Sequence, residues 1–277
     1  MPIERVNGDV VMLNTVSKVG KVLDLFSFKR PEWGVSEVAK ALHLPKSTAS
    51  DIMTSLTEQR LLTRVQGGRY RLGWRLFELS QVLLENTEFC IEARLVMQEL
   101  VERWGETTHL AVLDGAQVLY VEKLQATPAV QILLSRVGGR LPAHCSAVGK
   151  VLLSHQEQYR VPKLLEDLNL LAFTPNTITT IDKLIQELEE VQRCGYAYDH
   201  EEVALGLCCV AAPIHDLDGK VIAAISLSVP THRFYPQQEN YAAIILKSAQ
   251  HISENLGYRM NKSVRINRTQ KLTTTVV

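Results

Sequence analysis

The 277-residue sequence predicts an α+β protein in which a small helical domain with a β-hairpin precedes a larger domain built on an antiparallel sheet. The chain is long for one compact domain and ample for two, and its 46% hydrophobic content is sufficient for packed cores. Helical periodicity dominates its first part, whereas strand and helix patterns alternate later. Charge is also segregated. Residues 1–75 carry twelve Lys and Arg against seven Asp and Glu, residues 76–258 carry thirteen against twenty-three, and residues 259–277 carry five against none.

Composition limits the environment in which the protein works. No run approaches the roughly 20 apolar residues of a membrane span, so no membrane partner is expected. The first residues lack the charged and apolar regions of a secretory signal. The five cysteines are odd in number and form no C-x-x-C pair, which argues against a disulfide scaffold or structural zinc. These features predict a cytoplasmic protein without a cofactor.

The first domain begins with three predicted helices. Apolar residues recur with helical spacing over 15–28, and the sequence PEWG then interrupts the chain. A short helix is expected over 36–42, with Ser36 as its N-cap. A turn follows, and Pro45 suits the first position of a third helix over 45–59.

The third helix has two distinct faces. Ala49, Ile52, Met53 and Leu56 fall on one arc and are expected to face the core. The opposite face carries short hydroxyl side chains and one acid, Asp51. Short polar side chains allow a helix to enter the major groove of DNA and bond to base edges and phosphates. Two helices joined by a tight turn, the second with such a face, predict a helix-turn-helix.

A hairpin is predicted after this helix. Two short extended runs, 61–65 and 69–72, flank Gln66-Gly67-Gly68 and bring arginines to the hairpin tip, where they could reach phosphates. Together these elements predict a winged helix-turn-helix. The alternative is a small helical bundle that docks on another protein. The expected DNA contacts are Lys46, Ser47, Thr48, Ser50, Asp51, Thr54, Arg64 and Arg69.

The second part alternates between helix and strand patterns. Amphipathic helices are expected over 74–88, with a stripe of Leu76, Leu79 and Leu83, and over 88–104. Further helices are expected over 146–155, 181–194 and 240–256. Strands are expected near 107–113, 117–124, 129–135, 196–199, 207–214 and 221–228, and this order is typical of an α+β domain with an antiparallel sheet.

A ligand site is expected where the helix over 146–155 begins. Gly138-Gly139 permits sharp turns before it, and the free N–H groups at a helix start, together with the helix dipole, favour a carboxylate. The small residues Ala147 and Gly149 would let a ligand come close. His144, just before this helix, is expected to be a structural or capping residue.

Five stretches in register resemble the IclR family of bacterial transcription regulators. They are VSEVAKALHLPKSTAS and LLTRVQGGRYRLG in the first domain, and GGRLPAHCSAVGKVLLS, GYAYDHEEVALGLCCVAAPIHD and GKVIAAISLSVP in the second. The resemblance runs from about residue 13 to about residue 258. It implies a DNA-binding domain over 13–73, a linker helix over 74–88 and a GAF-like effector-binding domain over 89–258. The tail over 259–277 lies outside the resemblance, and its basic composition predicts disorder.

The resemblance also implies a function and its residues. It implies a regulator that binds double-stranded operator DNA as a homodimer or homotetramer, and that senses a small organic or aromatic carboxylate. The polar contacts to this effector then fall on Ala147, Val148, Asp199, Cys209, Ser226 and Ser228, and the apolar wall on Val130, Leu133, Leu141 and Leu207. The residues also permit plainer interpretations, because Asp199 could lie in a solvated loop, the serines could be small strand residues, and Cys208 or Cys209 could be buried thiols.

The sequence departs from the family pattern at two places. Asp51 stands where the family usually has Arg, in the middle of the groove-facing surface, so a different operator sequence is expected. Lys18 and Val19 replace an Arg-Ala pair in the first helix, which keeps the charge but loses the forked geometry of guanidinium.

Three other classes of function were weighed. An enzyme is not expected, because His144, Cys145 and Ser146 are sequence neighbours whose side chains diverge, and neither a P-loop nor a G-x-S-x-G elbow is present. A metal- or thiol-sensing regulator that uses His144, Cys145, Cys208 and Cys209 is the main alternative. An adaptor that docks on proteins and has no role at DNA is the third.

Overall fold

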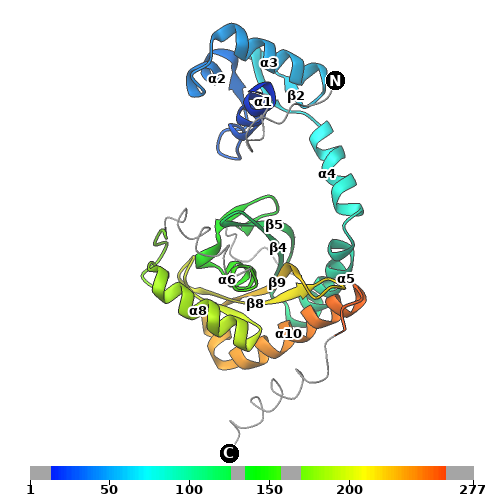
Figure 1. Ribbon diagram of the computed structural model, residues 1–277, viewed down its shortest axis with the longest axis vertical. Coiled ribbons are helices and arrows are strands. Elements are labelled where there is room, and N and C mark those ends of the chain that lie inside the picture. The colour runs from blue at the N-terminus through cyan, green and yellow to red at the C-terminus, as the bar shows by residue number, and fades with distance from the viewer. Residues whose placement is uncertain (1–13, 126–134, 157–169, 260–277) are drawn as a thin grey trace, which may run out of the picture. The chain divides into compact units, whose positions relative to one another are not determined.

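The computed structural model describes residues 14–125, 135–156 and 170–259 (Figure 1). They belong to two compact units, Met1–Asn86 and Thr87–Val277. The tail and most of the strand predicted near 129–135 lie outside the described residues. Within the described residues, no helix is long and apolar enough to cross a membrane.

The first unit is a winged helix-turn-helix. Its helices are α1 (Asn14–Asp24), α2 (Val35–Ala41) and α3 (Lys46–Glu58), and its strands are β1 (Trp33–Gly34), β2 (Leu62–Arg64) and β3 (Arg69–Leu72), with the 3-10 turn η1 (Gln66–Gly68) at the hairpin tip. The strands form one antiparallel sheet in the order β1-β3-β2. The four apolar residues predicted to face inward from α3 are all buried. They pack with Val22, Val38, Leu62 and Tyr70 into a single core.

Three local predictions in this unit were wrong. Trp33 and Gly34 do not simply break the chain, because they pair with β3 as a short strand. The N-cap of α2 is Gly34 rather than Ser36. The N–H of Gly34 donates to Glu37 Oε2 at 2.8 Å, so the Glu37 carboxylate lies at the positive end of the helix. Pro45 precedes α3 as its N-cap instead of being its first helical residue.

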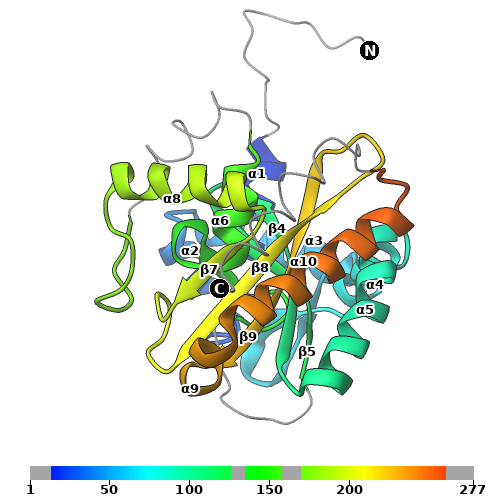
Figure 2. The same ribbon diagram turned by 90° about the horizontal axis from the view of Figure 1, so that it is seen from below.

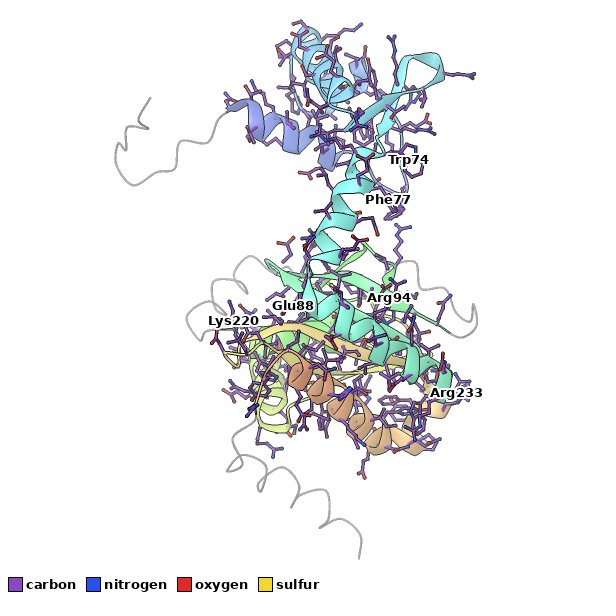
Figure 3. The ribbon with its side chains drawn as sticks, turned by 90° about the vertical axis from the view of Figure 1, so that its right-hand side faces the viewer. Trp74, Phe77, Glu88, Arg94, Lys220 and Arg233 are labelled. Carbon is purple, nitrogen blue, oxygen red and sulfur yellow. The ribbon has the colours of Figure 1, made fainter. Side chains whose placement is uncertain are left out.

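The next helix, α4 (Arg75–Glu85), has no buried residue within its own unit. It ends earlier than predicted, at Glu85, with Asn86 as its C-cap. Trp74 is 76% exposed and Phe77 is 57% exposed, and their rings meet edge to face at 6.2 Å between centroids. Both lie at the N-terminal end of α4 (Figure 3). Leu79, Val82 and Leu83 are exposed as well, so α4 presents an uncovered apolar surface.

The second unit is a six-stranded antiparallel sheet in the order β6-β5-β4-β9-β8-β7. The predicted α+β class is therefore confirmed. The strands are β4 (Thr107–Asp114), β5 (Gln117–Leu124), β6 (Arg140–Pro142), β7 (Ala197–His200), β8 (Leu207–His215) and β9 (Val221–Pro230). The strand β6, which is only three residues long, was not predicted from the sequence.

Helices cover both faces of this sheet. On one face lie α5 (Glu88–Trp104) and α10 (Gln238–Asn255), which cross the sheet in Figure 2. On the other lie α6 (Ala147–Ser154) and α8 (Ile181–Cys194). The helix α8 spans the predicted range 181–194, and Gly195 ends it in a left-handed conformation with φ of 83°. The short turns η3 (Ala143–Cys145), α9 (Thr231–Phe234) and η4 (Tyr235–Gln237) complete the unit.

Side chains that alternate along the strands contribute to two hydrophobic cores, one on each face of the sheet. Cys208, Val210 and Ala212 of β8 pack toward α10, whereas Cys209 and Ala211 face α6. Side chains of successive strand residues point to opposite faces, so the residues of β8 and β9 that meet α6 are fixed by the register of the sheet.

Candidate functional site

A cavity of about 30 Å3 lies on the α6 face of the sheet, above the roughly 10–15 Å3 that one water molecule needs. Of the residues predicted to contact an effector, eight line it: Leu141, Ala147, Val148, Asp199, Leu207, Cys209, Ser226 and Ser228. The other two, Val130 and Leu133, lie outside the described residues. Five lining residues were not predicted: His109, Tyr120, Ser135, Ser146 and Val203.

The register of four strands brings the polar lining residues together. Asp199 on β7 is paired with Cys209 on β8, and Cys209 is paired with Ser228 on β9. Ser226, two residues earlier on the same face of β9, is paired with His109 on β4. Asp199, Ser226 and Ser228 are all more than nine-tenths buried. The alternative that Asp199 lies in a solvated loop is therefore wrong.

The first turn of α6 forms another wall of the cavity. Ser146 caps this helix, because its Oγ accepts from the N–H of Gly149 at 3.2 Å. The first intrahelical bond runs from the N–H of Lys150 to the carbonyl of Ser146. The N–H groups of Ala147 and Val148 precede that bond, at the positive end of the helix dipole and at the edge of the cavity.

Gly149 has a different role from the one predicted. It does not line the cavity. A Cβ atom at this position would lie 2.1 Å from the carbonyl oxygen of Ala143 and 2.6 Å from its carbonyl carbon. The missing side chain therefore lets α6 pack directly on the backbone of the preceding 3-10 turn.

The Gly149→Ala substitution is expected to lower the free energy of unfolding by about 1–3 kcal/mol, because backbone atoms must move to relieve the overlap. Chemical denaturation of the full-length protein measures this loss. Gly20→Ala is the matched control, because a Cβ there meets nothing within 4 Å and a helical alanine is favoured over glycine. Equal stability of the Gly149→Ala variant and the wild type would contradict the close packing.

Buried ionisable groups surround the cavity. Burial raises the pKa of Asp199 to about 7, and the neighbouring Glu202 carboxylate adds to this, although the N–H of Glu202 donates to Asp199 Oδ1 at 2.6 Å. Burial, helped by the charge of Lys123, lowers the pKa of His109 to about 3, so the imidazole is neutral at physiological pH. Burial also raises the pKa of the Cys209 thiol.

Lys150 lies buried behind the cavity. Its Nζ donates to Glu202 Oε1 at 2.6 Å and to Glu187 Oε1 at 2.8 Å, so one ammonium faces two carboxylates. Although burial opposes its charge, these two carboxylates hold the pKa of Lys150 above its usual value. No Lys or Arg of the described residues lines the cavity itself. Anion recognition there would therefore depend on N–H and hydroxyl donors.

The unpredicted lining residues follow from the sheet rather than from a sequence motif. His109 and Tyr120 come from neighbouring strands, and their rings lie 5.2 Å apart. His109 is a polar residue within the mostly apolar strand β4, and its alternation with Ala111 on the α6 face is the sequence signal that could have identified it.

The four residues of the metal-sensing alternative do not converge. Cys208 packs in the core on the α10 face, away from Cys209. His144 Nε2 lies 3.2 Å from the carbonyl of Leu171, and Cys145 donates to the carbonyl of Pro142. Burial raises the pKa of Cys145 to about 12, which disfavours a thiolate. Among the described residues, no group of three or more His, Cys, Asp or Glu is placed to hold a metal ion.

The groove-facing surface of α3 is only partly open to solvent. Lys46, Ser47, Asp51 and Thr54 are exposed, and Thr48 and Ser50 are half-buried. At the hairpin tip, Arg64 is exposed and lies 6.0 Å from the centre of the Tyr70 ring.

Arg69 differs from the other predicted DNA contacts. Its guanidinium donates to the backbone carbonyl of Glu32 at 2.8 Å and lies 3.0 Å from Glu37 Oε2. These contacts hold the wing against the start of α2. The charge of Arg69 is thus matched within the domain itself.

Both units of this chain match families of known proteins. Residues 15–66 match the IclR helix-turn-helix domain, and residues 81–254 match the bacterial transcriptional regulator IclR C-terminal domain. The transcriptional regulators XynR and KdgR of Escherichia coli (strain K12) are each 33% identical to this chain, over 249 and 248 residues. These matches cover 89% of this chain, 98% of XynR and 94% of KdgR.

Solved structures agree with this assignment. The Thermotoga maritima IclR is 31% identical, with a TM-score of 0.68 over 89% of this chain and all of that one. An IclR homologue from Microbacterium hydrocarbonoxydans, solved in complex with 4-hydroxybenzoate, is 31% identical, with a TM-score of 0.78 over 88% of this chain and 99% of that one. These relatives are regulators rather than enzymes, and this chain belongs to the IclR family of bacterial transcription regulators.

Proposed function

We propose that this regulator senses a small carboxylate in the buried cavity beside α6 and changes its binding to operator DNA in response. The observation that supports it best is the combination of first-turn N–H groups of α6 with buried serines on β9 around one cavity. N–H and hydroxyl donors at a helix start suit a carboxylate. The homologue from Microbacterium hydrocarbonoxydans was solved with such an acid, 4-hydroxybenzoate.

The ligand proposal is tested by thermal shift of the purified full-length protein against small aliphatic and aromatic carboxylic acids. A ligand that binds only the folded state raises the melting temperature by mass action. A specific acid is expected to give such a shift, and Ser226→Ala is expected to reduce it. Ser154→Ala is the control, because Ser154 is also buried but donates to the carbonyl of Val151 and does not line the cavity. No response to any acid of the panel would contradict the carboxylate proposal.

The DNA proposal assigns different tasks to α3 and the wing. Arg64→Ala is expected to weaken binding to all duplexes similarly and to lower the salt slope by about one, as the loss of one phosphate contact does. Asp51→Ala is expected to change the preferred base at one position by about 1–3 kcal/mol, because a carboxylate can accept from the amino group of cytosine. Fluorescence anisotropy on duplexes of varied sequence and salt separates the two effects.

Arg69 provides the comparison for this test. Its charge is matched by Glu37 and Glu32, so we expect Arg69→Ala to lower the stability of the first unit and to leave the salt slope nearly unchanged. A salt slope that fell as much for Arg69→Ala as for Arg64→Ala would show that both arginines contact phosphate. Equal base preferences of Asp51→Ala and the wild type would remove Asp51 from the proposed base contacts.

A homodimer would bring two copies of α3 to a pseudo-palindromic operator in the cytoplasm. The uncovered apolar surface of α4 supports this assembly, because a second copy of the same helix could bury it. Contacts between sensor domains would extend the dimer to a tetramer. Analytical ultracentrifugation with Phe77→Glu is expected to show weaker association than the wild type.

A further inference from the structure

The ring of His109 has one nitrogen that no group of the described residues satisfies. His109 is 3% exposed and lines the cavity from β4. Its Nδ1 lies 3.4 Å from Ser228 Oγ, whereas its Nε2 is buried and has no hydrogen-bond partner among the described residues. A buried polar atom without a partner destabilises the folded protein, so in native proteins such an atom commonly binds a ligand or water.

The surroundings of the ring keep it neutral. Burial and the nearby Lys123 hold the pKa of His109 far below its ordinary value, and Lys123 is the residue paired with His109 on β5. A neutral imidazole carries one N–H and one unprotonated nitrogen. Nε2 is therefore either a donor or an acceptor, and Nδ1 takes the opposite role.

A chain of side chains connects His109 to Asp199. Ser228 Oγ lies 3.1 Å from Cys209 Sγ, and Cys209 contacts Asp199 through a side-chain hydrogen bond. If protons point along this chain toward His109, Ser228 donates to Nδ1 and Nε2 carries the hydrogen. If they point toward Asp199, Nδ1 donates to Ser228 and Nε2 is an acceptor. A hydroxyl group satisfies Nε2 in both arrangements, because it can donate as well as accept, and a carbonyl satisfies it in the first.

We infer that His109 Nε2 is a second recognition point of the cavity, and that the effector carries a hydroxyl or carbonyl oxygen in addition to its carboxylate. This inference rests on the proposed carboxylate site at α6. The two points lie on different walls, since His109 belongs to β4 and the N–H donors belong to α6. An acid without the second oxygen leaves Nε2 unsatisfied and binds more weakly.

The test uses matched pairs of acids that differ by one oxygen: benzoate with 3- and 4-hydroxybenzoate, and butanoate with 3-hydroxybutanoate, 4-hydroxybutanoate and 3-oxobutanoate. Calorimetric titration of the full-length protein gives the affinity for each. At least one oxygen-bearing acid is expected to bind about tenfold more tightly than its plain partner, the effect of one hydrogen bond of about 1.4 kcal/mol.

Two substitutions separate the ring nitrogens. The side-chain amide of Gln can occupy the position of Nε2, whereas that of Asn reaches only the position of Nδ1. His109→Gln is therefore expected to keep the preference for the oxygen-bearing acid. His109→Asn is expected to lose it, so that its affinities for the plain and the oxygen-bearing acid agree to within about threefold, a difference of under about 1 kcal/mol. His109→Phe, which has neither nitrogen, should behave like His109→Asn, and thermal melting verifies that each variant is folded.

The possible outcomes separate a failure of the role inferred for His109 from a failure of the proposed carboxylate site on which it rests. If no carboxylate of the panel binds the wild type, the proposed carboxylate site is wrong, and the role inferred for His109 is wrong as well. If plain acids bind and the oxygen-bearing partners gain nothing, or if the gain survives in both His109→Asn and His109→Phe, His109 is not a recognition point although the carboxylate site stands.

Discussion

Replacing Lys150 with Met is expected to lower the free energy of unfolding by about 3–5 kcal/mol, because it leaves the Glu202 carboxylate buried without its cation. Glu202 is 4% exposed, and Lys150 Nζ is 2.6 Å from its Oε1. Desolvation then opposes the carboxylate charge with no opposite charge to offset it. Chemical denaturation followed by circular dichroism measures the loss.

Two further variants show whether the charge or the packing is responsible. Adding Glu202→Gln to Lys150→Met removes the isolated charge and is expected to recover much of the lost stability. Glu187→Gln is the milder control, because the Glu187 side chain is 34% exposed and water can take the place of its contact with Lys150. If the double variant is as unstable as Lys150→Met alone, the loss comes from packing of the lysine stem, and the electrostatic explanation is wrong.

The second large effect is a dependence of stability on pH that comes from Asp199. Its pKa is about 7 in the folded protein, against an ordinary value of 3.8. As pH rises through 3.8, the unfolded chain loses this proton while the folded protein retains it. Stability therefore falls until the folded group also ionises near pH 7, and the loss is complete above that. The expected loss from this group between pH 5 and pH 8 is about 2–3 kcal/mol.

Asp199→Asn isolates this contribution, because an amide cannot ionise. The stability of the wild type minus that of Asp199→Asn is expected to fall as pH rises from 5 to 8. Asp218→Asn removes an exposed carboxylate of the same unit, and its difference from the wild type should stay nearly constant. A difference for Asp199→Asn that rose with pH would mean that the folded protein favours the charged carboxylate, the opposite of what burial predicts.

Periodicity and turn residues were sufficient to predict most elements of this fold. The predicted helix over 181–194 has the limits of α8, and the predicted strands near 107–113 and 117–124 correspond to β4 and β5. The short strands β1 and β6 were missed, because two or three residues contain no period. Both exist only because a longer neighbouring strand supplies their hydrogen bonds.

Some residues that line the cavity were predicted from the sequence and others were not, for a physical reason. Its α6 wall and the serines of β9 carry local signals and lie in stretches that resemble the family, whereas His109 and Tyr120 enter it only through the pairing of distant strands. Gly149 was misassigned, since a small residue at a helix start is equally consistent with contact to a ligand and with contact to backbone. The ion pair of Arg69 was not predicted, because its carboxylate partner, Glu37, is 32 residues away in the sequence.

Occupation of the cavity is proposed to change the affinity for DNA. Fluorescence anisotropy measures this change with the full-length protein on an operator duplex, selected from random sequences, with and without a saturating acid from the thermal-shift panel. Transcription from the same operator is followed in parallel. The account predicts a change in operator affinity of at least about fivefold, the lower end of usual coupling between sites. Ser226→Ala should shift this change to higher acid concentrations. Unchanged affinity and unchanged transcription at saturating acid would contradict it.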